Sequence, residues 1–412
     1  MGLHVRLTDK LILFAAIAAG CLSGGSAAKA AKGIQQATAS LQSGSDEKCP
    51  SHNDAEAALS KASELMSQSQ YQAAAAVLQP VSGKDCDARI SLLLAAATEG
   101  EGDGAKATAL LQHAHSVWPA NNSIAASLAR EYLVGKELDK AVKSLAQFHA
   151  TAETPEQETE MAVLVLLTTH QLVQAQTVAE AAYKYHPSVR TLLLLANTLQ
   201  LQGRYPDVNR LLGSQRETYA SSAEFFVTLA ESEFDASLYP AARDDLQHAI
   251  SLNPTMYQAH YLLGNVLSRL ADLDGAVAEY HKAIELAPSQ PRTYFQLALV
   301  LRSKQDPVGE QHILEQAIAA DGNYSPAQCE MGALLLDQQR PADAVSYLTA
   351  AVQSNPHYEK AYLLLAKAYA KLGENDKRDQ MVQRLQVIRD ENRLSSNGAN
   401  ENNTTAGEPM TP

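Results

Sequence analysis

The sequence has few aromatic residues and none of the common catalytic motifs. Aromatic side chains make up 6% of its 412 residues, and Trp118 is its one tryptophan. It contains no Gly-x-x-x-x-Gly-Lys-Ser/Thr loop for a phosphate, no His-Glu-x-x-His pair for zinc and no Gly-x-Ser-x-Gly nucleophile elbow. His113 and His115 are two residues apart on a predicted helix, so they point to different sides and cannot bind one metal ion together. The sequence therefore predicts no catalytic residue, no metal site and no cofactor, and we expect no enzyme activity.

Positive charge is also scarce. The chain has 33 Lys and Arg against 46 Asp and Glu, a formal net charge of −13. A protein that binds duplex nucleic acid needs cations to displace counterions from phosphates, so nucleic acid is not an expected partner. Acidic lipid headgroups would also repel a polyanionic surface.

The one pronounced apolar run lies at the N-terminus and is typical of a secretory signal peptide. Arg6 and Lys10 precede an apolar run that begins at Leu11, and the run is too short to span a bilayer comfortably. Residues Ala18 to Cys21 resemble the lipobox of bacterial lipoproteins, which would make 1–20 the signal and place a lipid on Cys21. Cleavage after Ala28, with 1–28 as the signal, is the alternative. Either reading predicts an exported protein, periplasmic or lipid-anchored in a bacterial envelope, with membrane contact only through Cys21.

The chain has only four cysteines. In an oxidising compartment, Cys49 and Cys86 could form a disulfide that closes the first helical hairpin, but two unrelated thiols explain them equally well. Cys329 falls at an inner position of a predicted helix and is read as a small buried apolar residue.

What the sequence does have is a period of about 34 residues. In each repeat, the eighth and twentieth residues are mostly small and the twenty-fourth is mostly large, as expected where two helices cross closely. The predicted first helices begin at Ala55, Ala88, Asn122, Glu156, Val189, Ala223, Tyr257, Pro291, Ser325 and Glu359.

The stretch from Tyr261 to Pro288 carries the pattern most fully, with Leu263-Gly264, Ala276, Tyr280 and a closing Pro288. This resembles the tetratricopeptide repeat. The resemblance implies an all-α fold, a right-handed superhelical solenoid of about nine to ten helix-turn-helix repeats.

Three residues depart from the pattern of this family. His260 stands where an aromatic residue is usual. Glu310 and Arg378 replace the small residue of the second helix. Glu310 predicts a loosened or shifted second helix, and Arg378 predicts that the last repeat is a solvent-facing cap.

The organisation that follows has five parts. Residues 29–54 form a flexible leader after the signal, 55–222 the more divergent repeats, 223–394 the more regular repeats with a cap, and 395–412 a disordered tail with no apolar face to bury.

In the family, the first helices line the concave side of the superhelix, where peptides bind. Between Tyr257 and Leu372, basic residues concentrate on the first helices, whereas the first helix that begins at Ala223 is acidic. The basic part favours an acidic peptide or protein partner. A solvated helix face whose charges only maintain solubility is the alternative. The candidate groove residues are Tyr261, Asn265, Arg269, Arg292, Phe295, Leu299, Arg302, Lys360, Leu363 and Lys367.

The sequence thus predicts a non-catalytic interaction scaffold in the bacterial envelope that binds a peptide or protein in its concave groove. The alternative is an accessory subunit of an envelope enzyme or of a secretion or assembly complex, whose catalytic chain is separate.

Overall fold

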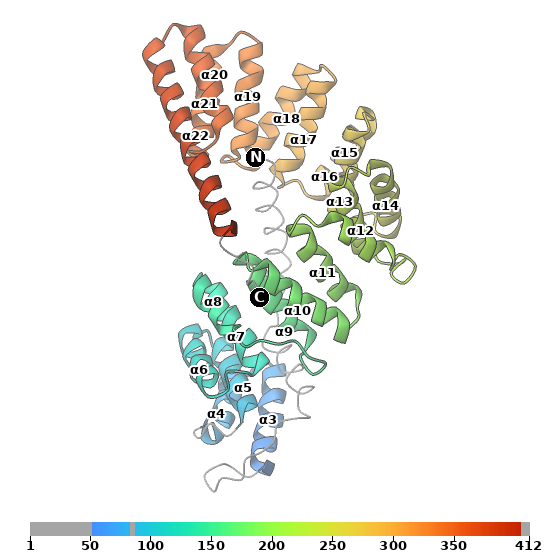
Figure 1. The fold of residues 1–412 in the computed structure, drawn as a ribbon, viewed down its shortest axis with the longest axis vertical. Helices are drawn as coiled ribbons and strands as arrows, with labels where there is room; N and C mark the ends of the chain where they lie inside the picture. Colours follow the sequence, from blue (N-terminus) through green and yellow to red (C-terminus); the bar gives the residue numbers. More distant parts are fainter. Residues whose placement is uncertain (1–51, 83–86, 405–412) are drawn as a thin grey trace, which may run out of the picture. The chain divides into compact units, whose positions relative to one another are not determined.

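The computed structural model describes residues 52–82 and 87–404, and these residues fold into successive helix pairs without a strand (Figure 1). The chain divides into two compact halves between Ala220 and Ser221, called the N-terminal and C-terminal halves below. The all-α repeat fold predicted from the sequence is confirmed. The candidate lipidation site Cys21 and the candidate disulfide between Cys49 and Cys86 lie outside the described residues.

The N-terminal half contains five helix pairs and one short 3₁₀ turn. They are α3 (His52–Ser67) and α4 (Tyr71–Leu78), followed by the 3₁₀ turn η1 (Gln79–Val81); α5 (Ala88–Gly100) and α6 (Gly104–Val117); α7 (Asn122–Val134) and α8 (Leu138–Ser144); α9 (Glu156–Thr168) and α10 (Leu172–Tyr185); and α11 (Val189–Leu201) and α12 (Tyr205–Gly213).

The C-terminal half is more regular and also contains five pairs. They are α13 (Ala223–Asp235) and α14 (Tyr239–Leu252), α15 (Tyr257–Arg269) and α16 (Leu273–Leu286), α17 (Pro291–Ser303) and α18 (Pro307–Ala320), α19 (Ser325–Asp337) and α20 (Pro341–Ser354), and α21 (Glu359–Leu372) and α22 (Asn375–Thr404). The predicted starts of the first helices are confirmed from Ala88 onward, while the first pair begins at His52 rather than Ala55.

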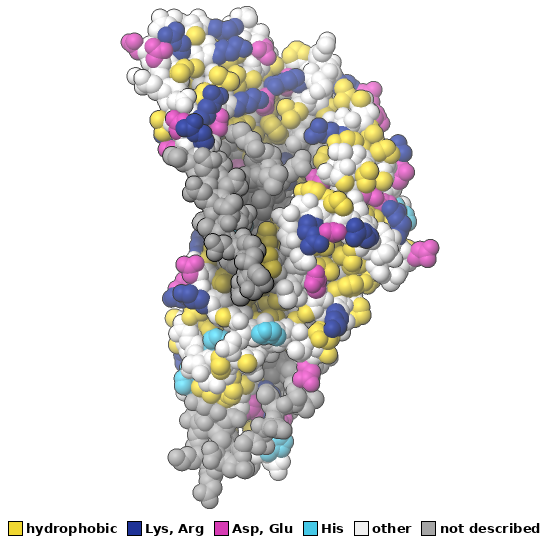
Figure 2. Space-filling view, viewed as in Figure 1, with side chains coloured by type: hydrophobic (Ala, Val, Ile, Leu, Met, Phe, Trp, Pro, Cys, Tyr) yellow, Lys and Arg dark blue, Asp and Glu magenta, His cyan; other side chains and the backbone are white. Residues whose placement is uncertain are grey.

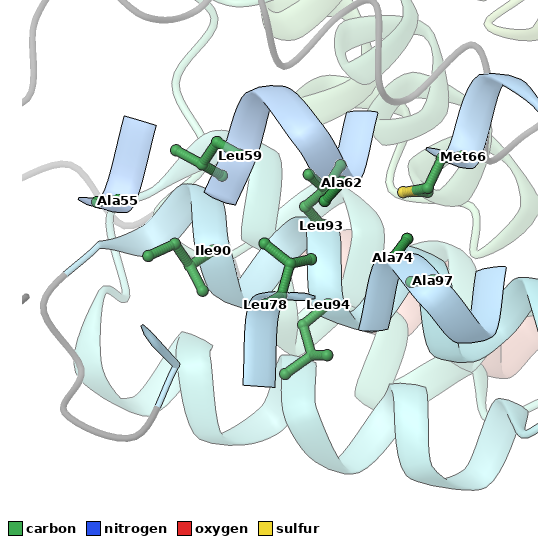
Figure 3. Packing of buried hydrophobic residues seen from close by; sticks show 10 residues of the cluster. All are labelled: Ala55, Leu59, Ala62, Met66, Ala74, Leu78, Ile90, Leu93, Leu94 and Ala97. Atoms are coloured by element: carbon green, nitrogen blue, oxygen red, sulfur yellow. The ribbon is translucent and has the colours of Figure 1, made fainter. Parts of the chain in front are cut away.

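The close crossing of each pair depends on its small residues. In the first pair, Ala62 and Ala74 have no exposed surface, and Leu78 fills the space beside them. Figure 3 shows these residues with Leu93 and Ala97 of the next repeat in one apolar cluster. The core is therefore shared between neighbouring repeats, as expected of a repeat array.

The turn inside each pair follows a rule that the sequence did not reveal. The fifteenth residue of each described repeat has a positive φ, which caps the first helix and reverses the chain. These residues are Ser69, Gly102, Lys136, His170, Gly203, Ser237, Ala271, Gln305, Gln339 and Gly373, with φ between 58° and 90°.

In three regular repeats the side chain of the fourth residue donates a hydrogen bond to the preceding turn, and these residues are His260, Tyr294 and Gln328. The hydroxyl of Tyr294 donates to the carbonyl oxygen of Pro288 at 3.0 Å. Nε2 of His260 lies 3.0 Å from the carbonyl oxygen of Pro254, six residues back in the same way. His260 therefore replaces an aromatic residue without loss of this contact, because its ring also presents a donor at that distance.

The expected disturbance at Glu310 is absent, and this prediction was wrong. The helix α18 is 14 residues long, the same length as α16 and α20. Glu310 is 2% exposed, and Nε of Arg302 in the same pair donates to its carboxylate at 2.8 Å. A buried carboxylate is tolerated at this crossing because an Arg side chain pairs with it.

The last helix is longer than the other second helices. Arg378 lies half-buried, at a position where most repeats bury an alanine. The backbone of α22 continues to Thr404, into the stretch 395–412 for which a disordered tail was predicted. A helix that is already formed extends by one hydrogen bond per residue without a new nucleus, so a polar sequence can follow it.

Candidate protein-interaction surface

The candidate groove residues lie on the first helices of the C-terminal half. Neighbouring first helices contact one another, α15 with α17, α17 with α19 and α19 with α21. We call the side chains at their second, fifth, ninth and twelfth or thirteenth positions the first-helix surface.

Tyr261 and Arg292 meet on this surface, although they belong to different repeats. The guanidinium carbon of Arg292 lies 5.2 Å from the centre of the Tyr261 ring. Its Nε donates to the Tyr261 hydroxyl at 3.2 Å. The ring of Tyr257 stacks at 6.0 Å on that of Tyr261. A guanidinium held over an aromatic face keeps its charge but loses freedom, so Arg292 is oriented before any partner arrives.

Asn265 is fixed from the second helix of its own repeat. The hydroxyl of Tyr280 donates to Oδ1 of Asn265 at 2.7 Å. Burial raises the pKa of Tyr280, so its hydroxyl remains a donor across the ordinary pH range. The amide nitrogen of Asn265 is thereby directed away from Tyr280 and can serve as a donor to a ligand.

The remaining predicted positions form a looser group. The ring of Phe295 makes an edge contact with Tyr324 at 5.9 Å. Leu299 is half-buried, Leu363 is 54% exposed, and Lys367 and Arg269 are exposed. The Arg269 guanidinium lies 6.0 Å from the ring centre of Phe234.

Arg302 and Lys360 converge on a carboxylate that sequence reasoning missed. Nη1 of Arg302 lies 2.5 Å from Oε2 of Glu330, whose side chain is 4% exposed. Nζ of Lys360 pairs with the other oxygen of that carboxylate. Arg302 also pairs with Glu310, at 2.5 Å from Nη2 to Oε1. We call Arg302, Glu310, Glu330 and Lys360 the four-residue ion cluster.

The titration of the cluster reflects burial as well as charge. Burial raises the pKa of Glu310, and the opposing effect of Arg302 does not cancel it. Burial tends to lower the pKa of Arg302, but its hydrogen bond to Glu310 and the Glu330 charge outweigh that effect, so its pKa is raised. The Arg302 guanidinium therefore stays charged at any pH at which the protein is folded.

The first-helix surface carries less uncompensated positive charge than a residue count suggests. Lys304 pairs with Asp274 of the neighbouring repeat. Lys371 donates to the neutral amide oxygen Oε1 of Gln339 at 2.8 Å, which holds the side chain without cancelling its charge. Figure 2 shows Lys and Arg side chains beside carboxylates over this half. Arg269 and Lys367, two exposed cations among the candidate groove residues, have no carboxylate at ion-pair distance within the described residues.

Cations also tie successive first helices in the N-terminal half. Nη2 of Arg89 lies 2.7 Å from Oε1 of Glu56 in the preceding repeat. Arg130 pairs with Glu99, and Arg190 pairs with Glu160; in both pairs the carboxylate again belongs to the first helix of the preceding repeat. Inter-repeat ion pairs are thus a general feature of the described repeats rather than a property of one site.

Two carboxyl groups of α9 are held away from water. Burial raises the pKa of Glu158 to about 7 against a hydrogen bond from Ser123, and its Oε2 has no hydrogen-bond partner in the described part of the chain. Burial likewise raises the pKa of Glu160 to about 7 against the charge of Arg190. These groups change protonation near neutral pH.

The described residues contain no group of His, Cys, Asp and Glu side chains that could hold a metal ion. Within residues 52–82 and 87–404, no helix combines the length and the apolar composition needed to cross a bilayer. Cys329 is a free, fully buried thiol, and burial raises its pKa to about 12. It is an unreactive core residue, as its position in the repeat predicted.

Comparison with known proteins gives two family matches and one curated relative. Two tetratricopeptide-repeat models match the chain, over residues 227–291 and 335–386. The chain is similar to the BBSome complex member BBS4 of Bos taurus, with 24% identity over 195 residues. That region is 46% of this chain and 37% of the relative, so the chain spans little more than a third of that protein.

Several solved structures are also similar. A crystal structure of MamA is 19% identical, covering 39% of this chain and 95% of that one, with a TM-score of 0.37. YrrB, described as a tetratricopeptide-repeat protein with an unusual peptide-binding site, is 18% identical over 46% of this chain and 97% of its own, with a TM-score of 0.36. The Cut9–Hcn1 structure is 11% identical over 81% and 87%, with a TM-score of 0.38. Because the TM-scores are this low, we draw no conclusion about this chain from these structures.

The matched segments both lie in the C-terminal half. Residues 227–291 include the crossing of Gly264 and Tyr280, and residues 335–386 include α20, α21 and the first part of α22. The same arrangement of paired helices, with a left-handed residue at the fifteenth position, recurs through the described repeats. The chain therefore contains tetratricopeptide repeats, which the family models match at 227–291 and 335–386.

Proposed function

We propose that this chain is a non-catalytic scaffold that holds an acidic segment of a partner protein on the first-helix surface of its C-terminal half. Tetratricopeptide-repeat proteins are generally non-catalytic scaffolds for protein–protein interaction, which supports the general part of this proposal. The finer part rests on Arg269 and Lys367, two exposed cations that face no carboxylate in the described part of the chain.

Aromatic and apolar side chains supply contact area between these cations. Tyr261 and Phe295 are half-buried, and Leu363 is more than half exposed. Partially exposed aromatic rings that are already fixed by neighbours bury surface on binding at little cost in conformational entropy. The surface therefore fits a segment that combines acidic with apolar residues.

A labelled acidic peptide of alternating Glu and Leu residues tests this proposal. We expect Arg269→Glu and Lys367→Glu each to weaken its binding by about tenfold, because each reversal replaces an attraction with a repulsion. Lys282→Glu is the control, since Lys282 is an exposed cation on the second helix α16, where it pairs with Glu285. Equal losses of affinity in all three variants would show only a response to net charge and would contradict binding on the first-helix surface.

We further propose that the protein is exported to a bacterial envelope. The support is the arrangement of Arg6, Lys10 and the apolar run that begins at Leu11, together with the lipobox-like segment that ends at Cys21. Mass spectrometry of the mature chain distinguishes the outcomes. A lipid adduct on Cys21 indicates a tethered protein, a start at Lys29 indicates a secreted one, and a chain that still begins at Met1 in a soluble fraction contradicts export.

A further inference from the structure

Glu330 is an isolated acid in an apolar stretch of α19. Its neighbours in sequence, Cys329 and Met331, are almost completely buried, and its own side chain is 4% exposed. A buried carboxylate is costly unless it is paired, and Glu330 is paired twice. Arg302 comes from the preceding repeat and Lys360 from the following one, so three successive first helices meet at one carboxylate.

The two cations are far more exposed than the carboxylate that they share. The Arg302 side chain is 36% exposed and that of Lys360 is 45% exposed. A partner that approaches the first-helix surface therefore reaches Arg302 and Lys360 before it reaches Glu330. It meets cations whose charge is already balanced, because the cluster contains two carboxylates and two cations.

An inter-repeat pair such as Arg89–Glu56 joins two repeats, whereas Glu330 joins three. Arg302 is shared with Glu310 of its own pair, so Lys360 supplies the second positive charge that balances the two carboxylates. The second cation makes the cluster neutral in the middle of a surface whose ends carry Arg269 and Lys367. Glu330 holds its two cations as a bound acidic side chain of a partner would.

We propose that Glu330 acts as a built-in acidic ligand, which occupies Arg302 and Lys360 and so excludes carboxylate-bearing segments from the middle of the first-helix surface. The inference rests on the proposed function and names the residue that sets its selectivity. A natural partner would then place its acidic residues near Arg269 and Lys367 and its apolar residues near Phe295 and Leu299.

The test is the variant Glu330→Gln in the full chain, titrated with the labelled Glu-Leu peptide. Gln preserves the shape and accepts hydrogen bonds but removes the negative charge. We expect the affinity to increase about tenfold, and to fall more steeply with added salt than that of the wild type, because the charge of Lys360 is no longer compensated while Arg302 stays paired with Glu310. A merely structural role of Glu330 would predict weaker or unchanged binding.

Glu315→Gln is the matched control. Glu315 is an exposed carboxylate on the second helix α18, where Gln311 donates to it at 3.0 Å. The Glu315→Gln variant loses the same charge at a position away from the first helices. Its affinity for the peptide should therefore stay within about twofold of that of the wild type. An equal gain in both variants would overturn the proposal.

Lys360→Gln gives a second, independent arm. In the wild type it should weaken binding by no more than about twofold, because Lys360 is occupied by Glu330, whereas in the Glu330→Gln background it should remove most of the gain. If Glu330→Gln does not fold, the single variant decides, since a loss in Lys360→Gln as large as that in Lys367→Glu contradicts an occupied lysine.

The outcomes separate this inference from the proposed function. If wild-type affinity for the peptide depends on Arg269 and Lys367 but is unchanged in Glu330→Gln, the inference is wrong and the proposed function stands. If the peptide binds only to Glu330→Gln, the inference is supported and the proposed function is wrong for this peptide. The absence of binding in both proteins overturns the inference, because the freed Lys360 should have bound the peptide.

Discussion

The ring of Tyr280 lies directly against the backbone of Gly264, so that a Cβ added at Gly264 would come within 2.7 Å of Cε1. Tyr280 is 1% exposed and its hydroxyl is held by Asn265, so the ring cannot easily move away. We expect Gly264→Ala to lower the free energy of unfolding by about 1–3 kcal/mol through overpacking. Urea unfolding of the full chain, with hydrogen exchange of α15 and α16, measures the effect.

Gly322→Ala is the control for this substitution. A Cβ at Gly322 would meet no atom within 4 Å, and this glycine does not have a positive φ. We expect the change to be within about 0.5 kcal/mol of zero. A Gly264→Ala protein as stable as this control would show that the two helices do not cross as closely as the structure indicates.

A stabilising substitution is expected at Ala271, the fifteenth residue of its repeat, whose φ is 63°. Because the Cβ of an L-residue is strained in the left-handed region, Ala271→Gly should raise the free energy of unfolding by up to about 1 kcal/mol. Ala278→Gly, on an exposed helical position of α16, should instead lower it by about 1 kcal/mol. Chemical denaturation of both variants checks the opposite signs, and the same sign in both would contradict a left-handed turn at Ala271.

The hydrogen bond from Tyr294 predicts a cost for removing one oxygen atom. In Tyr294→Phe the ring keeps its packing, but the carbonyl oxygen of Pro288 loses its donor. We expect a loss of about 1–2 kcal/mol in the free energy of unfolding. His260→Phe should show at least a comparable loss, because the contact of Nε2 with Pro254 and that of Nδ1 with Glu279 at 2.7 Å both disappear. A stability unchanged by both substitutions would mean that water satisfies these carbonyl groups equally well.

Glu158 makes the stability of the N-terminal half depend on pH. Its pKa is raised to about 7 by burial, above the ordinary 4.5, so the folded state binds the proton more tightly than the unfolded state. This contribution to stability is fully present below about pH 4.5 and is lost as the pH rises to about 7.

The variant Glu158→Gln should remove part of that slope. It should raise the free energy of unfolding at pH 7.5 by up to about 1 kcal/mol after allowance for partial exposure, and change it little at pH 4.5. Glu180→Gln, at an exposed position on α10, is the control and should leave the slope unchanged. Thermal unfolding across this pH range decides, and identical slopes in the wild type and Glu158→Gln would refute a buried acid.

The sequence was sufficient to predict the repeats but not the contacts between them. Small residues eight and twenty positions into most repeats, such as Ala129 and Ala141, mark a helix crossing directly because the two helices approach closely there. The left-handed residue at position fifteen had no such mark, since Ser, Lys, His, Ala and Gln all occur there. The geometry of the turn fixes that φ, so no particular side chain is required at this position.

The ion cluster could not be predicted from the sequence for a different reason. Glu330 and Arg302 are separated by 28 residues. Glu310 stands where most repeats have an alanine, so its own repeat considered alone predicts a disturbed helix. An isolated charge in the apolar run around Glu330 was the one available signal, and the pattern of the family drew attention to basic residues instead. Pairing across repeats follows from how the helices stack, which a single repeat does not encode.

The most direct test of the scaffold proposal is site-specific photocrosslinking of the full chain in envelope extract. A photoreactive residue at Leu363, exposed on the first-helix surface, should form an adduct with a partner, and Glu-Leu peptide should compete with it. The same residue at Val308, which is 79% exposed at the start of the second helix α18, should not form that adduct. Adducts at Val308 but none at Leu363, or adducts indifferent to the peptide, would contradict binding on the first-helix surface.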